Sequence, residues 1–223
     1  MKNVILVMIM ALIVGCSKGE DSPETPSTIT DIDGNVYNSV VIGKQTWMKT
    51  NLNVSKYQDG TLIPEVTDPD QWAKLTTGAW CYYDNDPENG KLYGKLYNWY
   101  AVNDRRGLAP TGTRIPTDAE WATLTTFIGS VAGGKMKEIG TANWSSPNSE
   151  ATNSTLFTGL PGGIIINEGT FYFIGDHGYW WSSTSNANTT TAAWNLSLGY
   201  NSVIACRSYD DKNYGFSVRC IKK

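Results

Sequence analysis

The chain has 223 residues, which suits one domain or a small pair of domains. Its formal net charge of −3 gives no reason to expect a nucleic-acid partner. Charged residues make up 17%, below the ~25% usual for globular domains, while there are 12 Tyr and 9 Trp. This composition favours a compact extracellular β-rich domain over a cytosolic α/β enzyme. The single histidine, His177, excludes a zinc site built from several histidines.

The N-terminus has the pattern of an export signal. Lys2 is followed by an unbroken apolar run from Val4 to Val14, which is too short to span a bilayer and fits the core of a signal peptide. The run ends in Ile-Val-Gly-Cys, which resembles the bacterial lipobox. That resemblance implies cleavage after Gly15, so that residues 1–15 are a lipoprotein signal peptide and Cys16 carries the lipid. The alternative is an ordinary signal peptide with a chance cysteine.

Residues 16–28 are polar and acidic and include two prolines, so they cannot bury enough apolar surface to fold. We expect a flexible tether there, with the folded domain spanning residues 29–223. A short acidic stretch after the lipidated cysteine also resembles the surface-export signals of lipoproteins in the Bacteroides group. The predicted location is therefore the outer membrane, lipid-anchored and facing the exterior, with a periplasmic orientation as the alternative.

Three elements are predicted in the first half of the domain. Asp33-Gly34 is a typical hairpin turn, with strand-like residues on both sides of it. The sequence Asp68-Pro69-Asp70 predicts a short helix that continues to Leu75. Helical spacing of apolar residues predicts another helix over 91–104, despite Gly94.

The stretch GTRIPTDAEW contains a complete helix start. Thr117 and Glu120 have the spacing of a capping box, and Pro116 stands just outside the helix, where its missing N–H costs nothing. Trp121, Leu124 and Ile128 then follow as an apolar stripe. The stretch therefore needs no catalytic role.

Short strand candidates follow from residue 162 onward, separated by polar turns such as Asn167-Glu168-Gly169. The candidates are GIIIN, TFYFIG, GYWWSST, AAWNLSL, SVIACRSY and GFSVRCIK. Two helices thus precede a β-rich half, which predicts an α+β domain.

Eight motifs together resemble the Fibrobacter succinogenes major paralogous domain, found in many lipoproteins, over roughly residues 32–221. In chain order they are VIGKQTWMKTNL, WCYYDND, GKLYNWYAVNDRRGLAPTG, IPTDAEW, GGKMKE, LPGG, GYWWSST and YGFSVRC. Three of the landmarks, RIPTDAEW, WWSST and GFSVRC, also look like the formylglycine-generating-enzyme branch of the C-type lectin-like fold. The resemblance implies a C-type lectin-like domain with two helices, twisted antiparallel sheets and long loops. It implies an architecture and a location, and no particular activity.

Three cysteines follow Cys16. Family members with more cysteines often carry them at the positions of Asn89 and Ala109, which leaves the usual partners of Cys81 and Cys220 in doubt. Cys206 and Cys220 lie on candidate neighbouring strands and are the candidate disulfide, which an exported chain permits. Whether they pair or remain free is open, and Cys81 would be a free, buried thiol.

The sequence favours a protein that is not an enzyme. The copper chemistry of formylglycine-generating enzymes needs two close thiols, whereas Cys206 and Cys220 are fourteen residues apart. His177 and its neighbour Asp176 are poorly arranged for a Ser-His-Asp site, and no serine has a nucleophile-elbow signature. Paired carboxylates for glycoside hydrolysis stay open, although the acids lie mostly in turns.

No cofactor is expected, and a structural calcium ion is left open. The stretch YYDNDPENG groups hard oxygen ligands at Asp84, Asn85 and Asp86 without the spacing of an EF-hand. The calcium motifs of C-type lectins, Glu-Pro-Asn and Trp-Asn-Asp, are missing.

Aromatic side chains in the variable loops are the remaining binding candidates, because Tyr and Trp contact sugar faces and protein partners. The candidate ligand-binding residues are Trp144, Tyr172, Asp176, His177 and Tyr200. The predicted function is non-catalytic binding of an extracellular glycan or protein by a surface lipoprotein. The alternatives are an envelope or fimbria-like structural component and, third, an enzyme related to formylglycine-generating proteins.

Overall fold

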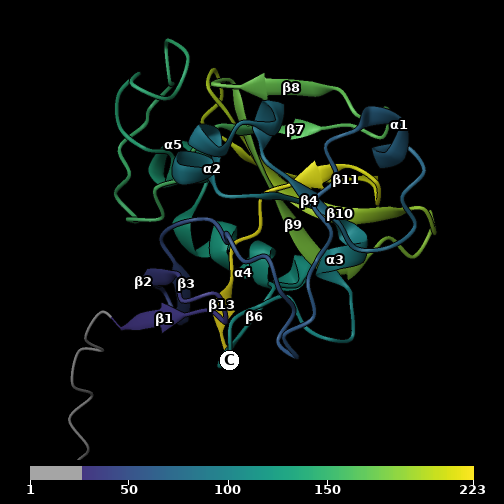
Figure 1. The fold of residues 1–223 in the computed structure, drawn as a ribbon. Coiled ribbons are helices and arrows are strands. Elements are labelled where there is room, and N and C mark those ends of the chain that lie inside the picture. The colour runs from purple at the N-terminus through teal and green to yellow at the C-terminus, as the bar shows by residue number, and fades with distance from the viewer. Residues whose placement is uncertain (1–26) are drawn as a thin grey trace, which may run out of the picture.

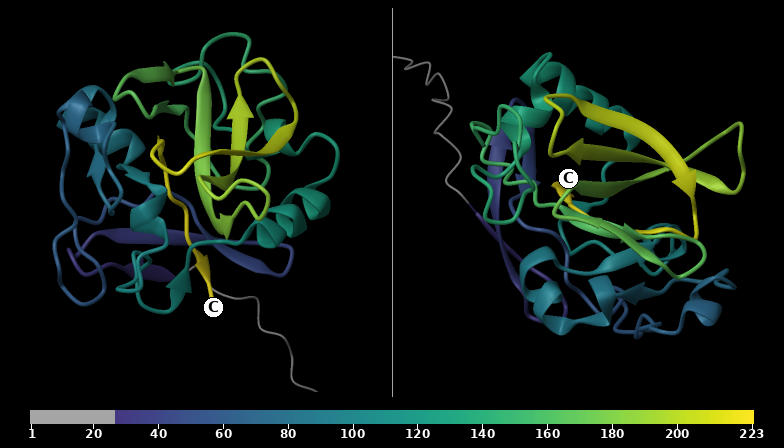
Figure 2. Two further views of the ribbon diagram at one scale, coloured as in Figure 1. Left: turned by 90° about the vertical axis from the view of Figure 1, so that its right-hand side faces the viewer. Right: turned by 90° about the horizontal axis from the view of Figure 1, so that it is seen from above.

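The computed structural model describes residues 27–223, which form two mainly antiparallel sheets (Figure 1). The predicted signal peptide and Cys16 lie outside the described residues. The first strand begins at Thr28, one residue before the predicted start of the domain. Figure 2 shows that the blue segment of residues 51–103 lies along one side of the green and yellow strands of the larger sheet.

The smaller sheet joins both ends of the domain. Its C-terminal strand β13 pairs with β3 through Ile221 and Trp47, and with β6 through Ile221 and Arg114. The predicted turn at Gly34 connects the first two strands, so the hairpin prediction is confirmed. In sheet order the strands are β1 (Thr28–Thr30), β2 (Val36–Ile42), β3 (Gln45–Met48), β13 (Ile221–Lys222) and β6 (Thr113–Arg114).

The larger sheet contains the strands predicted in the second half of the chain. Its long strands β9 and β10 pair antiparallel, while β7 meets β9 in parallel. Strand β11 forms one edge and β4 the other. In sheet order the strands are β11 (Ala205–Asp211), β10 (Ala192–Gly199), β9 (His177–Ser185), β7 (Gly162–Ile165), β12 (Gly215–Phe216), β5 (Leu96–Asn98) and β4 (Trp80–Cys81), with β8 (Phe171–Ile174) paired to β7.

The helices are more numerous and shorter than the two that were expected. Within residues 27–223 only one of them exceeds two turns, because most of the chain pairs in short strands and irregular loops instead. The helices are α1 (Pro69–Trp72), the 3-10 helix η1 (Tyr83–Asn85), α2 (Pro87–Tyr93), α3 (Trp99–Val102), α4 (Asp118–Ile128) and α5 (Ala132–Met136).

The capping box at the start of α4 is confirmed. The Thr117 hydroxyl accepts a hydrogen bond from the Glu120 amide at 3.2 Å, and the Glu120 carboxylate accepts one from the Thr117 amide at 2.9 Å. Arg114 adds an ion pair to the same carboxylate. Trp121, Leu124 and Ile128 are buried, as the stripe predicts. Glu120 therefore serves the helix start.

The predicted helix over 91–104 is wrong, because Gly94 ends α2 in a left-handed conformation with φ +74°. A side chain at Gly94 would also meet the Leu52 carbonyl oxygen, 2.8 Å from the position of a Cβ. The chain then runs through the buried strand β5, and Asn98 caps the separate short helix α3. Sheet pairing here overrides the helical spacing of the apolar residues.

The core also contains a buried guanidinium group. Arg219 is fully buried, and its charge lies 4.2 Å from the centre of the Phe157 ring. It donates to the Asn51 side-chain oxygen at 2.6 Å and to the Phe157 carbonyl oxygen. These partners are neutral, and burial lowers the pKa of Arg219 to about 9.

The candidate disulfide between Cys206 and Cys220 is absent, and the three cysteines within residues 27–223 are free thiols. Cys206 is exposed on β11 of the larger sheet, whereas Cys220 is buried beside β13 of the smaller sheet. The prediction failed because residues 215–222 do not form one strand next to β11. They leave the larger sheet after β12 and cross to the smaller one. Cys81 is free and buried, as predicted.

Candidate functional site

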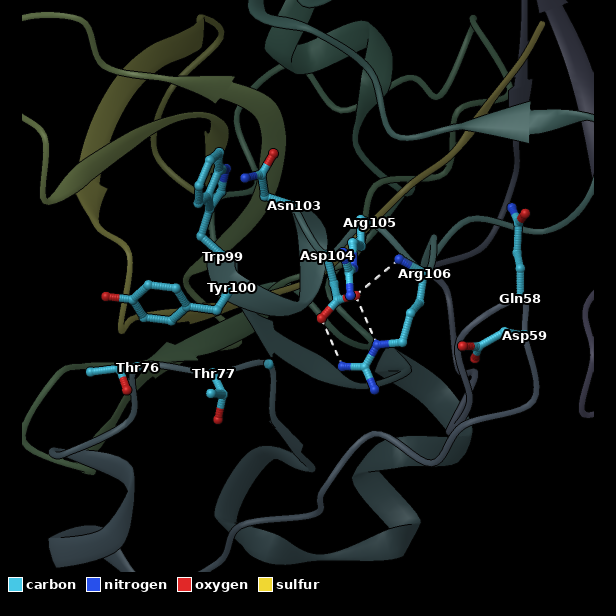
Figure 3. Close-up of a pocket in the computed structure, with 11 residues that line it drawn as sticks. Gln58, Asp59, Thr76, Thr77, Trp99, Tyr100, Asn103, Asp104, Arg105 and Arg106 are labelled. Atoms are coloured by element: carbon cyan, nitrogen blue, oxygen red, sulfur yellow. Dashed lines mark hydrogen bonds and ion pairs between the residues drawn. The ribbon is translucent and has the colours of Figure 1, made fainter.

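A wide, open cleft of about 1170 Å³ lies between three segments of the first half of the domain (Figure 3). It combines two carboxylates, two guanidinium groups, hydroxyls, amides and one accessible aromatic ring. The lining residues are Gln58, Asp59, Thr76, Thr77, Gly78, Trp99, Tyr100, Asn103, Asp104, Arg105 and Arg106.

Asn98, at the end of β5, holds two walls of the cleft together. Its side-chain oxygen accepts hydrogen bonds from the amides of Ala79 and Ala101, both at 3.0 Å, and its side-chain nitrogen donates to the Thr77 carbonyl at 2.8 Å. Asn98 is fully buried, so these partners have no water to replace it. Together with the bond from the Asn98 backbone amide to the Ala79 carbonyl at 3.1 Å, this side chain holds helix α3 against the 76–79 segment.

The ion pair of Asp104 and Arg106 lies in the middle of the cleft (Figure 3). Two side-chain nitrogens of Arg106 donate to the two carboxylate oxygens of Asp104 at 2.9 and 2.7 Å. This bidentate geometry fixes both side chains, and the guanidinium also lies 4.0 Å from the centre of the Tyr57 ring. The hydrogen bonds from Arg106 lower the pKa of Asp104 to about 2.

A second acid lies at the far end of the cleft. Asp59 accepts a hydrogen bond from the Thr61 amide at 2.9 Å, which lowers the pKa of the carboxyl. Next to it, the Gln58 amide donates to the Gly107 carbonyl at 2.9 Å, and the Gln58 side chain donates to the Ala109 carbonyl at 2.5 Å. These bonds tie the 58–59 segment to the loop that follows the ion pair.

Tyr100 supplies the accessible aromatic ring. Figure 3 shows it on the side of the cleft away from Gln58 and Asp59, with the ion pair between them. Its neighbour Trp99 is buried, and the Trp99 indole nitrogen donates to the Ser182 carbonyl at 2.9 Å. Tyr100 is only partly buried, so a ligand in the cleft can contact its face.

The cleft is suited to hydrogen bonding with a neutral ligand. Asp59 and Asp104 are balanced by Arg105 and Arg106, and the remaining polar groups are neutral. Because the pKa values of both carboxyl groups lie below their usual range, both groups are ionised acceptors at neutral pH.

Four of the five predicted ligand residues lie close together, but outside the cleft. At the turn between β8 and β9, the ring of His177 lies 6.4 Å from the ring of Tyr200, and the Tyr200 amide donates to the Asp176 carbonyl at 2.9 Å. The ring of Phe173 lies between Tyr172 and His177. Its centre is 5.8 Å from that of the Tyr172 ring and 5.3 Å from that of the His177 ring. We call Tyr172, Phe173, Asp176, His177 and Tyr200 the aromatic patch.

The prediction that Trp144 binds a ligand is wrong, because this residue is buried. Its side chain is 1% exposed, and its indole nitrogen donates to the Gly159 carbonyl at 3.0 Å. A polar, glycine-rich sequence around this residue predicts an exposed loop, yet the loop folds back and buries the ring. Trp144 belongs to the core.

Sequence reasoning missed the cleft residues, because Gln58, Asp59, Thr76 and Thr77 come from turn-rich segments without periodicity. One signal was present. The motif GKLYNWYAVNDRRGLAPTG supplies six of the lining residues, Trp99, Tyr100, Asn103, Asp104, Arg105 and Arg106.

The part of the chain from residue 27 onward contains no group of three or more His, Cys, Asp or Glu side chains arranged to hold a metal ion. In the predicted calcium stretch, Asp86 accepts from the Glu88 amide at the start of α2, and the Asn85 side chain donates to the Thr67 carbonyl. Over the same residues, no helix has both the length and the apolar character needed to cross a bilayer.

These features define an α+β domain with a polar, charge-balanced cleft. Residues 40–222 match the family model of the Fibrobacter succinogenes major domain. The chain therefore belongs to this family, as its motifs predict. It matches no curated protein and no solved structure.

Proposed function

We propose that this protein is a surface-exposed, lipid-anchored bacterial protein that binds an extracellular glycan without chemically changing it. The observation that carries the proposal is the cleft, where the exposed face of Tyr100 lies beside the fixed pair of Asp104 and Arg106. The hydroxyl groups of a sugar are both donors and acceptors, and this lining offers ionised acceptors, guanidinium donors and amides at short range.

The state of the acids supports binding over hydrolysis. A glycosidase needs one carboxylic acid whose pKa is raised, so that it can protonate the leaving group. In this cleft the pKa values of Asp59 and Asp104 are both lowered. A second reading, as an enzyme related to formylglycine-generating proteins, would need two close and reactive thiols. Cys206 is exposed, whereas burial raises the pKa of both Cys81 and Cys220.

We assign the domain to the C-type lectin-like fold within this proposal. The arrangement that supports this assignment is helix α4 followed by curled antiparallel strands, with a long irregular segment over 137–161.

The lipid anchor is tested separately from binding. Cys16→Ala should move the protein from the membrane fraction to the soluble fraction and abolish labelling with a fatty-acid analogue. Cys206→Ala is the matched control, since it removes an exposed thiol and leaves the lipobox intact. Labelling that survives Cys16→Ala would show that the protein is anchored in another way, or is secreted.

Binding is tested with the soluble domain, residues 27–223, against an array of bacterial, plant and host polysaccharides. Tyr100→Ala and Arg106→Lys should each weaken binding at least roughly tenfold, the loss expected for a stacked ring or a bidentate contact of about 1.4 kcal/mol or more. Tyr172→Ala is the matched control, an exposed tyrosine outside the cleft. The proposal fails if no polysaccharide binds, or if Tyr172→Ala alone removes binding.

The aromatic patch supports a second candidate function, that of an envelope or fimbria-like component that contacts another protein. Phe173 is 44% exposed and holds a left-handed backbone with φ +68°, which is unfavourable for a bulky residue. Exposed, strained aromatic residues are typical of contact surfaces. Capture of an envelope protein that is lost in Phe173→Ser, together with an empty polysaccharide array, would favour this role.

A further inference from the structure

A second hollow of about 350 Å³ adjoins the cleft, and Tyr100 lines both. Tyr100 is thus the one lining residue that the two hollows share. The other residues around the second hollow come from the end of α1, the turn between β7 and β8, and the segments on either side of β10 and β11. They are Ala73, Asn167, Glu168, Thr191, Asp211 and Asn213.

Hydrogen bonds connect the segments that form the walls of the second hollow. The indole nitrogen of Trp72 donates to the Asn213 carbonyl at 2.8 Å, and the Asn167 side chain donates to the Asp211 carboxylate at 3.4 Å. On the cleft side, the Trp99 amide donates to the Lys212 carbonyl at 2.9 Å. Lys212 thereby connects the segment under the second hollow to the helix that carries Tyr100.

The charge of the second hollow restricts the ligand further. It adds the carboxylates of Glu168 and Asp211, against which the nearest cation is the Lys212 ammonium, 2.6 Å from the Thr190 carbonyl and 4.6 Å from the centre of the Trp99 ring. The lining of the cleft is balanced, so the two hollows together carry an excess of negative charge. A polymer rich in uronic acid or sulfate would be repelled, whereas a neutral chain would not.

The size of the two hollows favours a polymer over a single sugar. Pockets for small molecules occupy about 300–1000 Å³ and enclose their ligand. The cleft alone has about 1170 Å³, is open to solvent, and shares Tyr100 with the second hollow. A site that is open and longer than one ligand unit is suited to a chain that enters at one end and leaves at the other.

We propose that the two hollows act as one groove for an internal segment of a neutral polysaccharide, with Tyr100 contacting the sugar at the junction. The inference rests on the proposed glycan binding at the cleft, and it names the ligand class. Sugar units in the cleft meet the Asp104–Arg106 pair, and units beyond Tyr100 meet Glu168 and Asp211. Binding should therefore strengthen with chain length, and a chain end should not be required.

The experiment is calorimetry with ladders of one to six sugar units from β-1,4-glucan, β-1,4-xylan and α-1,4-glucan. Each ladder is tested with free and with borohydride-reduced ends, and polygalacturonate serves as the acidic polymer. For the ladder that binds, affinity should rise until the chain fills both hollows, and reduction of the end should have no effect. Polygalacturonate should bind at least roughly tenfold more weakly than the neutral polymer.

Variants separate the two hollows. Glu168→Ala and Asp211→Ala should weaken the longest oligomers roughly three- to tenfold, the loss of about one hydrogen bond, and leave the shortest binding oligomer unchanged. Glu88→Ala is the control, an exposed acid on α2 that lines neither hollow. Tyr100→Ala should weaken every length.

The outcomes distinguish the two proposals. Failure of every ladder and polymer to bind overturns the proposed function and this inference with it. Binding that is lost in Tyr100→Ala, but does not grow with length and ignores Glu168→Ala and Asp211→Ala, overturns only the groove. Loss of binding on reduction of the chain end, or equal binding of polygalacturonate, also overturns the groove and leaves the cleft as a binding site.

Discussion

The cleft and the aromatic patch each contain a segment fixed by a fully buried polar side chain, and these two side chains differ in charge. Asn98 fixes the walls of the cleft with three hydrogen bonds. Lys137 fixes the loop that carries Tyr200, because its ammonium group donates to the carbonyls of Gly199, Tyr200 and Ser202 at 3.0, 3.4 and 3.0 Å. The neutral amide of Asn98 thus connects the walls of the cleft, whereas the Lys137 cation fixes the Tyr200 loop of the aromatic patch.

That difference makes the two regions respond differently to pH. In the cleft, the pKa of Asp104 is lowered to about 2 and the pKa of nearby Tyr57 is raised to about 12. At the patch, burial lowers the pKa of Lys137 to about 8 and also lowers the pKa of His177. The cleft therefore keeps a constant charge over the range in which the patch titrates. A binding site that must work across changing external conditions is better served by the cleft.

The largest effect is expected from Asn98→Ala. The substitution leaves two buried amides and one partly buried carbonyl without their side-chain partner, which should cost about 2–4 kcal/mol of unfolding free energy. Chemical denaturation measures this loss, and glycan binding should fall with it because the walls separate. Asn38→Ala, on the exposed face of β2, is the control and should be nearly neutral. A neutral Asn98→Ala would mean that the walls are held in another way.

Lys137→Met should have the next largest effect, and its size depends on pH. The folded-state pKa of about 8 lies below the usual 10.5, so between these values the unfolded chain binds more protons than the folded one. Wild-type stability should therefore rise, relative to the variant, by about 1–3 kcal/mol as pH increases from 8 to 10.5. Denaturation of both proteins across this range measures the difference. The exposed Lys91→Met should follow the wild type, and a constant offset for Lys137→Met would show that Lys137 is not titrating there.

His177→Gln should have the smallest effect, at lower pH. Burial lowers the folded-state pKa of His177 below 6.5, so protonation of the unfolded chain destabilises the wild type as pH falls below 6.5. Because the ring is only partly buried, the loss should be below about 1 kcal/mol. The variant should lack this loss when denaturation at pH 7 and pH 5 is compared. If the variant instead declines as steeply as the wild type, the acid sensitivity comes from carboxyl groups.

The sequence predicted those parts of the fold that depend on neighbouring residues. The capping box at Thr117, the turn at Gly34 and the strands between residues 162 and 211 are local patterns, and each of them is present. Three predictions failed because the deciding contact is distant. The Leu52 carbonyl lies against Gly94, the crossing of residues 215–222 separates Cys206 from Cys220, and folding of a polar loop buries Trp144.

The two candidate sites also differ in whether their residues are close together in the sequence. The aromatic patch was predictable in part, because Tyr172, Asp176 and His177 are close in sequence, on β8 and at the turn that leads to β9. The cleft was not, because its three segments are joined by long-range hydrogen bonds, such as those from Gln58 to Ala109 and from Asn98 to Thr77. The one indication of the cleft in the sequence was the charged part of the motif GKLYNWYAVNDRRGLAPTG, after Tyr100.

One comparison tests the central claim most directly: the affinity of wild type, Tyr100→Ala and Tyr172→Ala for the polysaccharide that binds best, measured at pH 5.5, 7 and 8.5. We expect Tyr100→Ala to lose at least roughly tenfold in affinity, as expected for a ring contact of about 1.4 kcal/mol. Tyr172→Ala should match the wild type, and the wild-type affinity should stay constant over the three pH values. Loss of binding in Tyr172→Ala alone, or an affinity that follows the titration of His177, would contradict the account and place the site at the aromatic patch.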